Sequence, residues 1–592
     1  MNEILTRDKL PENYKWDMTA LYADDAAWEQ ERAAVAAELD TLGALAGELG
    51  QPERLLTALD HMFQLGCRLD RLITYACCRR DEDNSNPTYQ RLSDMAMHLY
   101  QQFIEATAFI EPELLSLPED YLRSAMARTE FADYRVYLKG VLRQRPHTLS
   151  REMEALMAST AELRRAPDNI YSMMTDADMT FPTIKDAQGN DVEITHGNFI
   201  PLLESADREV RRNAWDGLML TLAKWGNTIA TTYSSSVKAD IFEARARKYP
   251  NTLEASLYGN EIPRSVCDNL ISEIHGRLDA MGRYIKLRGR LLGLDTVRPY
   301  DMYTPIVGDV DMGLDYEHAY DEVVKSLAPL GEEYVSQLRA ARSERWIDVY
   351  ENRGKTSGAY STGAFGAHPY VLLNYQPTLD SRMTIAHEMG HAMHSWYSQR
   401  TQPYPTADYS LFVAEVASTC NEMLVMRDLL RTVTDKRQRA FLLNHLLEQF
   451  RTTMFRQTQF AEFEMKAHAQ AEAGEPLTSE SLCALYDSLI AQYYPGMERG
   501  DTVKYEWMRI PHFYRAYYVY QYATGFAAAV ALSGKILADG PENYLRFLSL
   551  GSSLPPIEEL KIAGVDMSTP EPVHQALDFF EQVLAEFESL MV

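Results

Sequence analysis

Apolar residues recur at three- and four-residue spacing from the start of the chain to about residue 175, and this period predicts one helix after another. The clearest runs are 26–49, 52–80, 88–109 and 119–143. Helical periodicity resumes near residue 207 and continues with breaks to about residue 294. A further helix is expected over 316–343, and beyond about residue 380 the chain is helical almost to its end. The pattern therefore predicts a mainly α protein.

Two short segments break the helical pattern and predict β structure. Residues 179–184 and 192–195 flank a turn rich in Gly, Asn and Asp, which predicts a hairpin. Four glycines spread over 354–366 precede an apolar run at 370–375, which predicts a small glycine-rich sheet. An exposed edge of this sheet could hold an extended peptide by main-chain hydrogen bonds. A hairpin that binds nothing is the alternative.

The length and the charge of the chain limit its organisation and its partners. With 592 residues it exceeds what one hydrophobic core usually organises. We expect a helical N-terminal domain over 1–200, with the hairpin near its end, and a second domain over 201–592. The net charge of −27 repels phosphate backbones and anionic lipids, so neither nucleic acid nor a membrane is an expected partner.

Cysteine usage and the N-terminal residues indicate the compartment. No apolar stretch of signal-peptide length follows a basic start, so export is not indicated. The longest nearly uncharged apolar stretch, around 526–532, is too short to span a bilayer. Six cysteines are scattered without a C-x-x-C pair, which argues against a disulfide scaffold or a cysteine zinc site. We expect a protein of the reducing cytoplasm.

The most specific motif is H-E-x-x-H at 387–391. On a helix, His387 and His391 lie on one face and can both reach one ion. Imidazole pairs suit zinc, which in catalytic sites takes three protein ligands and leaves a position for water. A histidine pair satisfied in the core is the alternative. A metzincin is excluded, because that class needs Gly and His where this chain has His394 and Tyr397. We expect His394 either to support the site or to be a solvated helix residue.

The third ligand is sought among three carboxylates at seven-residue spacing, Asp408, Glu415 and Glu422. Glu415 is favoured because it lies within the apolar run 411–417, where an unpaired carboxylate would cost several kcal/mol and a zinc ion would compensate its charge. A Glu415 that is hydrogen-bonded to backbone or to an arginine is the alternative. Glu422 would then support a ligating histidine through a hydrogen bond.

The remaining residues of this pattern suit hydrolysis of a peptide bond. Glu388 points away from the two histidines around the helix, so it can accept a proton from a metal-bound water. Segment 504–522 is rich in tyrosines and contains His512, and such donors can stabilise an oxyanion. An aromatic core helix is the alternative for this segment. No phosphate-binding G-x-x-x-x-G-K-[ST] loop is present, so nucleotide hydrolysis has no support.

Together, several blocks resemble the M3 family of zinc metallopeptidases, and most closely its oligoendopeptidase F branch. They are 354–361, 386–395, 412–419, 510–514 and 517–522. The resemblance extends over nearly the whole chain. It implies a mainly α, two-lobed, zincin-like fold with a deep central channel that admits short peptides. It also implies a small β-sheet next to the H-E-x-x-H helix, and a catalytic domain over 201–592.

The resemblance also implies the roles of individual residues. It implies one Zn²⁺ per chain with Glu388 as the general base. The zinc ligands that it implies are His387, His391 and Glu415, the catalytic donors are His512 and Tyr520, and the further substrate contacts are Gly358, Ala359, Tyr360, Tyr514 and Tyr517. The interval from His512 to the tyrosines is shorter than in thimet-type relatives, so the individual roles of Tyr514 and Tyr517 stay open.

The expected function is a cytoplasmic zinc endopeptidase that cleaves internal bonds of short oligopeptides. One rival is a zinc carboxypeptidase, which would need a cation to bind the terminal carboxylate of its substrate. The other is a peptide-binding protein with a structural zinc ion, which would have no use for Glu388 beside an open coordination position. The oligomeric state stays open between monomer and homodimer.

Overall fold

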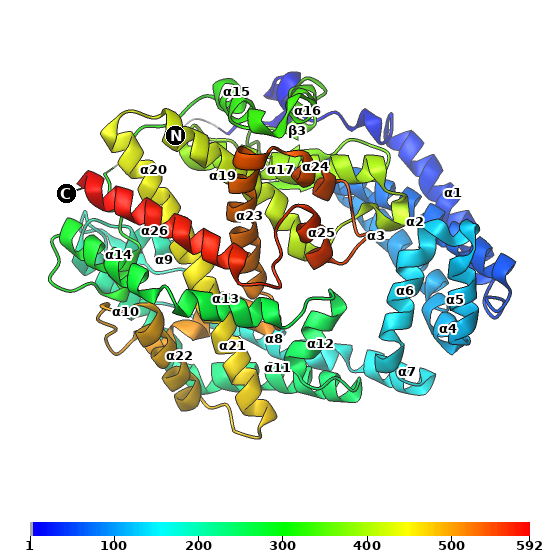
Figure 1. Cartoon of the computed structure of the whole chain (residues 1–592), viewed down its shortest axis with the longest axis horizontal. Helices are drawn as coiled ribbons and strands as arrows, with labels where there is room; N and C mark the ends of the chain where they lie inside the picture. Colours follow the sequence, from blue (N-terminus) through cyan, green and yellow to red (C-terminus); the bar gives the residue numbers. More distant parts are fainter. Residues whose placement is uncertain (1–3, 309, 592) are drawn as a thin grey trace. The chain divides into compact units, whose positions relative to one another are not determined.

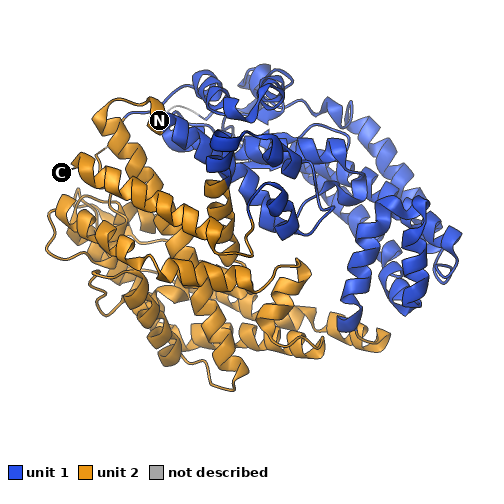
Figure 2. Cartoon of the chain, in the orientation of Figure 1, with its two compact units in different colours: residues 1–148, 311–429, 532–565 blue, residues 149–310, 430–531, 566–592 orange. Residues whose placement is uncertain are grey.

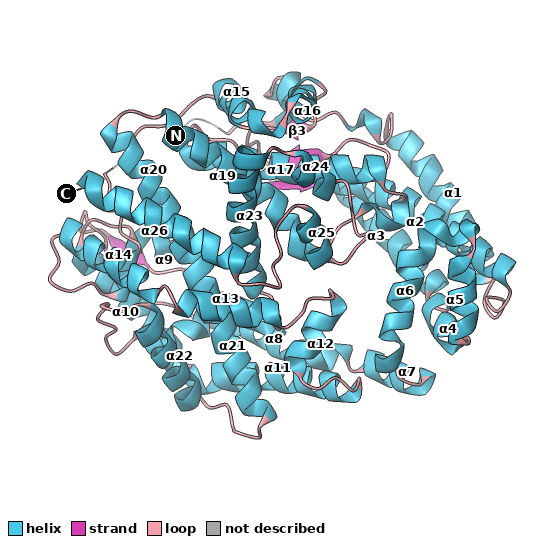
Figure 3. Ribbon diagram, in the orientation of Figure 1, coloured by secondary structure: helices cyan, strands magenta, loops and turns pink. Residues whose placement is uncertain are grey.

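Helices make up most of the chain in the computed structural model, which describes residues 4–308 and 310–591 (Figures 1 and 3). This confirms the prediction of a mainly α protein. The helices form two compact units, each assembled from three separate stretches of sequence (Figure 2). Unit 1 comprises 1–148, 311–429 and 532–565, and unit 2 comprises 149–310, 430–531 and 566–592. Over the described residues, no helix combines the length and the apolar character needed to cross a membrane.

Unit 1 contains the first six helices and the three-stranded sheet. Its elements are α1 (Asp25–Gly43), α2 (Pro52–Glu82), α3 (Pro87–Thr107), α4 (Ile110–Ser116), α5 (Glu119–Ala127), α6 (Arg135–Gln144), α15 (Tyr316–Ser326), α16 (Glu332–Ser343), β3 (Ile347–Asp348), β4 (Tyr360–Thr362), β5 (Tyr370–Leu372), α17 (Leu379–Thr401), α18 (Tyr404–Ala407), most of α19 (Leu411–Thr432), α24 (Glu542–Leu548) and α25 (Pro556–Ile562).

Unit 2 contains the hairpin and a second set of helices. Its elements are α7 (Arg151–Ser159), α8 (Ala161–Ser172), β1 (Thr183–Lys185), β2 (Asp191–Glu193), α9 (Phe199–Leu203), α10 (Arg208–Lys224), α11 (Gly226–Ala246), α12 (Thr252–Gly259), α13 (Ser265–His275), α14 (Leu278–Leu291), α20 (Lys436–Gln449), α21 (Arg456–Glu472), α22 (Ser479–Tyr493) and α26 (Glu571–Met591). Helix α23 (Tyr520–Asp539) begins in unit 2 and ends in unit 1. The domain boundary expected at residue 200 stays a prediction.

Two of the predicted helices are each divided in the structure. The segment 316–343 forms α15 and α16, because Pro329 and Gly331, which has φ 91°, interrupt the helix between them. The segment 119–143 breaks into α5, a short 3₁₀ turn and α6. There the side chain of Arg135 donates hydrogen bonds to the carbonyls of Met126 and Arg128, at the end of α5 and the start of the 3₁₀ turn.

Both predicted β segments are confirmed. Strands β1 and β2 form an antiparallel hairpin around the turn at 186–190. In unit 1 the strand order is β3-β5-β4, with β3 parallel and β4 antiparallel to the central β5. Strand β4 therefore lies at an edge of the sheet, as the glycine-rich pattern suggested. Helix α17 contacts both β4 and β5, which confirms the expected sheet next to the H-E-x-x-H helix.

The hydrophobic core of unit 1 joins its N-terminal helices to this sheet. Trp28 of α1 and Leu59 of α2 have no exposed surface, and they belong to the same cluster as Tyr370 and Leu372 of β5. Trp16 also packs edge-on against Tyr370, with ring centroids 6.0 Å apart. Residues separated by more than 300 positions along the chain thus share one core, and this core holds the sheet beside α17.

A buried ion pair fixes the turn that leads into the edge strand. The Lys355 ammonium lies 2.7 Å from Asp348 Oδ1, and both side chains are fully buried. It also donates hydrogen bonds to the carbonyls of Tyr350 and Leu373. Arg7 from the N-terminal segment lies 2.6 Å from Asp348 Oδ2. A buried ammonium group must find partners for all its donors within the protein. Lys355 finds them in Asp348 of β3, in Tyr350 and in Leu373 after β5, and so ties the glycine-rich turn to both strands.

We expect Lys355→Met to lower the free energy of unfolding of unit 1 by about 3 kcal/mol, because it leaves the buried Asp348 with Arg7 alone as a cationic partner and takes a donor from the carbonyls of Tyr350 and Leu373. Urea unfolding followed by circular dichroism measures the change. Lys185→Met is the matched control, because the Lys185–Asp191 pair is 63% and 71% exposed. Its loss should cost less than about 1 kcal/mol. Equal changes in the two variants would contradict the structural role of Lys355.

Candidate metal centre

Helix α17 carries the H-E-x-x-H motif and has one face buried in unit 1. It begins after Thr378, whose hydroxyl accepts a hydrogen bond from the N–H of Ser381 at 3.1 Å. Ile385, Met389 and Ala392 are at most 1% exposed. This apolar stripe anchors the helix and leaves the two motif histidines on another face.

A glycine inside the motif sets the distance between α17 and α19. A Cβ atom at Gly390 would lie only 2.6 Å from Ser418 Cα and 2.8 Å from the carbonyl oxygen of Ala417. The two helix backbones therefore approach more closely than any other residue would permit. Beside this contact, the buried amide of Asn421 donates to the carbonyl of Ala386 at 3.1 Å. The register of α19 on α17 is thus fixed by one steric and one polar contact.

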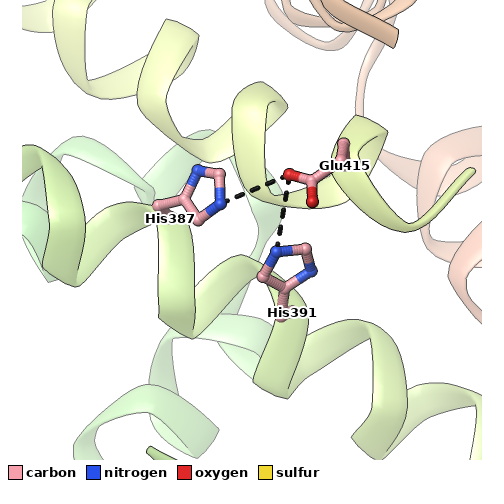
Figure 4. A group of neighbouring side chains, drawn as sticks. All are labelled: His387, His391 and Glu415. Atoms are coloured by element: carbon pink, nitrogen blue, oxygen red, sulfur yellow. Dashed lines mark ion pairs between the residues drawn. The ribbon is translucent and has the colours of Figure 1, made fainter. Parts of the chain in front are cut away.

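This register brings three side chains together at one point (Figure 4). Nitrogen and oxygen atoms of His387, His391 and Glu415 all lie within 4.8 Å of one another. Glu415 Oε2 is 3.4 Å from His387 Nε2 and 3.7 Å from His391 Nε2. Figure 4 shows both imidazole rings turned toward the carboxylate of Glu415 at the start of α19. Of the carboxylates considered from the sequence, Asp408 is not part of this group.

The carboxylate of Glu415 is less buried than its apolar neighbours in sequence suggest. Its side chain is 42% exposed, whereas Val413 and Val416 have no exposed surface. The run 411–417 is helical, so Phe412, Val413, Val416 and Ala417 face the core while Glu415 faces the histidines and Leu411 is exposed. Burial alone therefore does not require a cation at Glu415. The stronger argument is that the two imidazoles and this carboxylate converge.

Glu422 lies two turns further along α19 and orients the first histidine. Its Oε1 is 2.5 Å from His387 Nδ1, so Nε2 is the nitrogen that remains toward Glu415. Burial disfavours a charged His387, yet hydrogen bonds to Glu415 and Glu422 outweigh it and raise the pKa of His387 to about 10. For His391, burial and the neighbouring His387 lower the pKa to about 4. Acidic partners thus surround the first histidine, while the second has a neutral imidazole.

Glu388 lies next to this group without belonging to it. It is 7% exposed, and burial raises its pKa to about 7. The neighbouring His387 and, to a smaller extent, a backbone hydrogen bond from Ser361 in β4 oppose this rise in the pKa. The carboxyl group is therefore held between the histidine helix and the edge strand of the sheet, within unit 1.

His394 is buried, so the expectation that it could be a solvated helix residue is wrong. Its residue surface is 1% exposed, and its ring stacks on Tyr409 with centroids 3.6 Å apart. Burial lowers the pKa of His394 to about 3. Tyr409 in turn exchanges a hydrogen bond with Ser395 at 2.9 Å and donates to the carbonyl of His391 at 3.4 Å. Sequence reasoning did not single out Tyr409, which carries no motif of its own.

The glycine-rich segment presents partly exposed backbone at the sheet edge. Gly358 is exposed and has φ 84°, and its carbonyl accepts from the Asn374 amide at 2.8 Å. Ala359 is half-buried. The Tyr360 hydroxyl donates to Asp81 at 2.8 Å, so this side chain faces the protein interior. Substrate binding by these three residues stays a prediction.

The other predicted site residues belong to unit 2, where they lie between residue 512 and the first residue of α23. His512 is exposed, and Tyr514 shares a 2.7 Å hydrogen bond with Thr232. Tyr517 and Tyr520 are each 3% exposed. Burial raises the pKa of both phenols well above the usual value, so both stay protonated at neutral pH. The roles of His512, Tyr514, Tyr517 and Tyr520 in binding and catalysis stay predictions.

The half-buried tyrosines nearest to His512 are ones that sequence reasoning did not select. The centroid of the His512 ring lies 6.3 Å from that of Tyr518 and 6.1 Å from that of Tyr522. Tyr520, by contrast, is buried. Tyr518 precedes α23 and Tyr522 lies in its first turn, so the only signal in the sequence was the density of tyrosines over 517–522.

The donor set of the unit 1 cluster fits a divalent transition metal. Two imidazole nitrogens and one carboxylate oxygen are ligands that zinc accepts in catalytic sites. Among the described residues, the group has three members of ligand type, which leaves coordination positions for water and substrate. This arrangement defines a metallopeptidase. It combines two histidines of an H-E-x-x-H helix, Glu415 from a second helix, and Glu388, which lies beside the ligand group without belonging to it.

Comparison with known proteins identifies the family. Residues 201–579 match peptidase family M3, and residues 113–181 match the family described as oligopeptidase F. The chain is 46% identical to oligopeptidase PepF of Bacillus subtilis, over 100% of this chain and 89% of that protein. It is 40% identical to group B oligopeptidase PepB of Streptococcus agalactiae, over 99% and 98% of the two chains.

A solved structure gives the same result for the fold. The crystal structure of oligoendopeptidase-F from Enterococcus faecium aligns with a TM-score of 0.74 and 36% identity, covering 96% of this chain and 99% of that one. The chain belongs to peptidase family M3. Membership confirms the resemblance read from the sequence and the prediction of a metalloendopeptidase.

We expect Gly390→Ala to weaken zinc binding by about 10–100-fold, because the added Cβ pushes α19 away and misplaces Glu415. Competition titration with a chromophoric chelator measures the affinity. Gly140→Ala in α6 is the control, since a Cβ there meets nothing within 4 Å. That variant should bind zinc normally and lose no stability. Unchanged affinity in Gly390→Ala would show that the helix contact does not set the ligand geometry.

Proposed function

We propose that the protein is a zinc-dependent endopeptidase that hydrolyses internal bonds of short oligopeptides, with one zinc ion per chain. The observation that carries the proposal is the position of Glu388, buried beside the histidine–glutamate cluster but not part of it. Membership of peptidase family M3 supports the reaction class. The printed names of the relatives, which include oligopeptidases and an oligoendopeptidase, support the substrate class.

In this proposal His387, His391 and Glu415 hold the metal ion. Zinc, when bound, supplies a Lewis acid that polarises oxygen atoms of water and substrate. Glu422 keeps Nε2 of His387 directed at the ion by occupying Nδ1, at 2.5 Å. Glu415 is oriented through Ser418, whose hydroxyl lies 3.3 Å from Glu415 Oε2. Manganese or cobalt could also occupy such a donor set, and metal analysis distinguishes them.

Glu388 acts as the general base. It takes a proton from the attacking water while the water oxygen bonds to the carbonyl carbon. It then gives this proton to the amine nitrogen as the peptide C–N bond breaks. In the same proposal His512 and Tyr520 stabilise the developing oxyanion as hydrogen-bond donors. Tyr514, Tyr517, Gly358, Ala359 and Tyr360 are the further proposed substrate contacts.

Strand β4 is a suitable place for the substrate backbone. It lies at the edge of its sheet, and its residue Ser361 is hydrogen-bonded to Glu388 through the backbone. A peptide that adds to this edge would be read by its main chain, so many side chains would be tolerated. The same contact would place the bound backbone next to the general base.

The cluster argues against a closed structural zinc site. Structural zinc takes four protein ligands, usually with cysteine among them. Here three potential ligands are grouped among the described residues, and none is a cysteine. All six cysteines are free thiols, which supports the proposal that the protein works in the reducing cytoplasm. The oligomeric state remains open between monomer and homodimer.

A peptide that carries a fluorophore and a quencher and is blocked at both ends tests the proposed function. We expect cleavage at an internal bond, inhibition by a chelator and recovery when zinc is restored. Mass spectrometry of the products locates the cut. Failure to cleave the blocked peptide, combined with release of C-terminal residues from unblocked peptides, would identify a carboxypeptidase instead.

We expect Glu388→Gln to keep about one zinc ion per chain but to lower kcat by about 10²–10⁴-fold, because the amide cannot accept the proton. Elemental analysis and steady-state kinetics measure the two quantities. Glu415→Ala is the comparison variant, in which retention of zinc on dialysis should itself fall. Near-normal turnover in Glu388→Gln would remove Glu388 from the mechanism. Unchanged zinc in Glu415→Ala would point to Asp408 or Glu422 as the ligand.

A further inference from the structure

A strained turn lies between His512 and helix α23 in unit 2. Tyr517 has φ 56°, in the left-handed region that glycine normally occupies. The turn is closed by the N–H of Tyr518, which donates to the carbonyl of Arg515 at 3.2 Å. A residue with a Cβ keeps this backbone conformation only where its surroundings hold it. Tyr517 therefore needs partners that fix its conformation.

A buried glutamate of α21 holds the backbone of this turn. Glu464 Oε1 accepts the N–H of Tyr517 at 2.8 Å, and the residue is 1% exposed. One turn later, His468 packs against the Tyr517 ring with centroids 4.8 Å apart. His468 is itself fixed, by the Glu464 carbonyl at Nδ1 and by Asp240 of α11 at Nε2. The Tyr517 hydroxyl shares a 2.6 Å hydrogen bond with Thr252. The peptide N–H, the ring and the hydroxyl are therefore all restrained.

The restraint on Tyr517 also determines the direction of the next side chain. Tyr518 comes directly after the strained residue, and its ring lies beside those of His512 and Tyr522, with centroids 6.3 and 5.4 Å away. A different peptide orientation at Tyr517 would redirect Tyr518 and remove one neighbour of His512. At 1% exposure Glu464 is too deeply buried to bind a ligand, so its effect on a reaction passes through this turn.

We propose that Glu464 is a positioning residue: its buried carboxyl group holds the left-handed turn at Tyr517 and so fixes the orientation of His512 toward a bound peptide. The proposal rests on the proposed function, since that function gives His512 its role. Glu464 does not touch the substrate in this arrangement.

The protonation state of Glu464 determines which substitution preserves its charge and its hydrogen bond. Burial raises the pKa of Glu464 to about 8, with His468 and the Tyr517 N–H opposing the rise and Asp240 adding to it. The carboxyl group is therefore mostly neutral at pH 7, and its carbonyl oxygen can still accept the Tyr517 N–H. Glutamine has the same shape, charge and acceptor, whereas leucine has a similar size and no acceptor.

The test compares Glu464→Gln with Glu464→Leu on the blocked fluorogenic peptide. Glu464→Gln should stay within about threefold of the unaltered enzyme, because the amide keeps the carbonyl acceptor. Glu464→Leu should lower kcat by about 10–100-fold with zinc content unchanged, as expected for a misplaced catalytic group. In a His512→Ala background, Glu464→Leu should cost little more, since its effect passes through His512. Equal losses in the two Glu464 variants, or a full multiplication of the Glu464→Leu and His512→Ala effects, would overturn the proposal.

A second variant, Thr252→Val, and the NMR signal of His512 also test the proposal. If Glu464→Leu does not fold, Thr252→Val takes its place, because it removes the hydroxyl partner of Tyr517 and keeps the side-chain shape. A reduction of kcat that disappears in the His512→Ala background supports the proposal, and an independent reduction overturns it. The NMR signal of the His512 ring, assigned by its loss in His512→Ala, should shift in Glu464→Leu and not in Glu464→Gln. This readout needs no turnover, so it separates failure of the positioning role from failure of the proposed peptidase reaction.

Discussion

The close approach of α17 and α19 at Gly390 is the contact on which the metal site depends. Because a Cβ at this position would meet the backbone of Ser418 at 2.6 Å, the two helices can meet only at a glycine. The approach brings Glu415 to within 3.7 Å of both histidines, although it lies 24 residues beyond His391. Ligand geometry is here a result of helix packing, so residues that never touch the metal ion determine how well it is bound.

The sequence was sufficient for the residues that lie on one helix and insufficient for contacts between helices. The four-residue spacing of His387 and His391 predicted their shared face, and the hairpin and the sheet were predicted from turn residues. The burial of His394 could not be predicted, because it depends on Tyr409 and Phe547, which approach from other elements. Similarly, Glu415 was selected for its apolar neighbours in sequence, but in the structure its side chain is 42% exposed. The periodicity of apolar residues predicts on which face of a helix a residue lies. The elements that pack against that face are decided by tertiary structure.

Each of the two units uses buried charged or polar groups to fix a loop near predicted site residues. In unit 1, Lys355 holds the turn before β4 through Asp348 and two backbone carbonyls. In unit 2, Glu464 holds the turn at Tyr517. Removal of such groups from water is costly, and each is retained where irregular backbone must adopt one conformation. The side chains proposed to act on a peptide are thus carried by loops whose shape is set from the interior.

The composition of the unit 1 core has a consequence for how the chain reaches its native state during synthesis. Leu59 and Leu72 of α2 share their cluster with Tyr370 and Leu372. When only the first 150 residues have been synthesised, helices α1–α6 are present but strand β5, which completes their core, has not yet been made. The helices α1–α6 can already pack against one another, but the part of the cluster that Ala364, Tyr370 and Leu372 cover stays uncovered until more than 200 further residues have been added, and all of residues 149–310, which belong to unit 2, emerge in between. For that interval the nascent chain is exposed to aggregation and would benefit from a chaperone that covers its first helices.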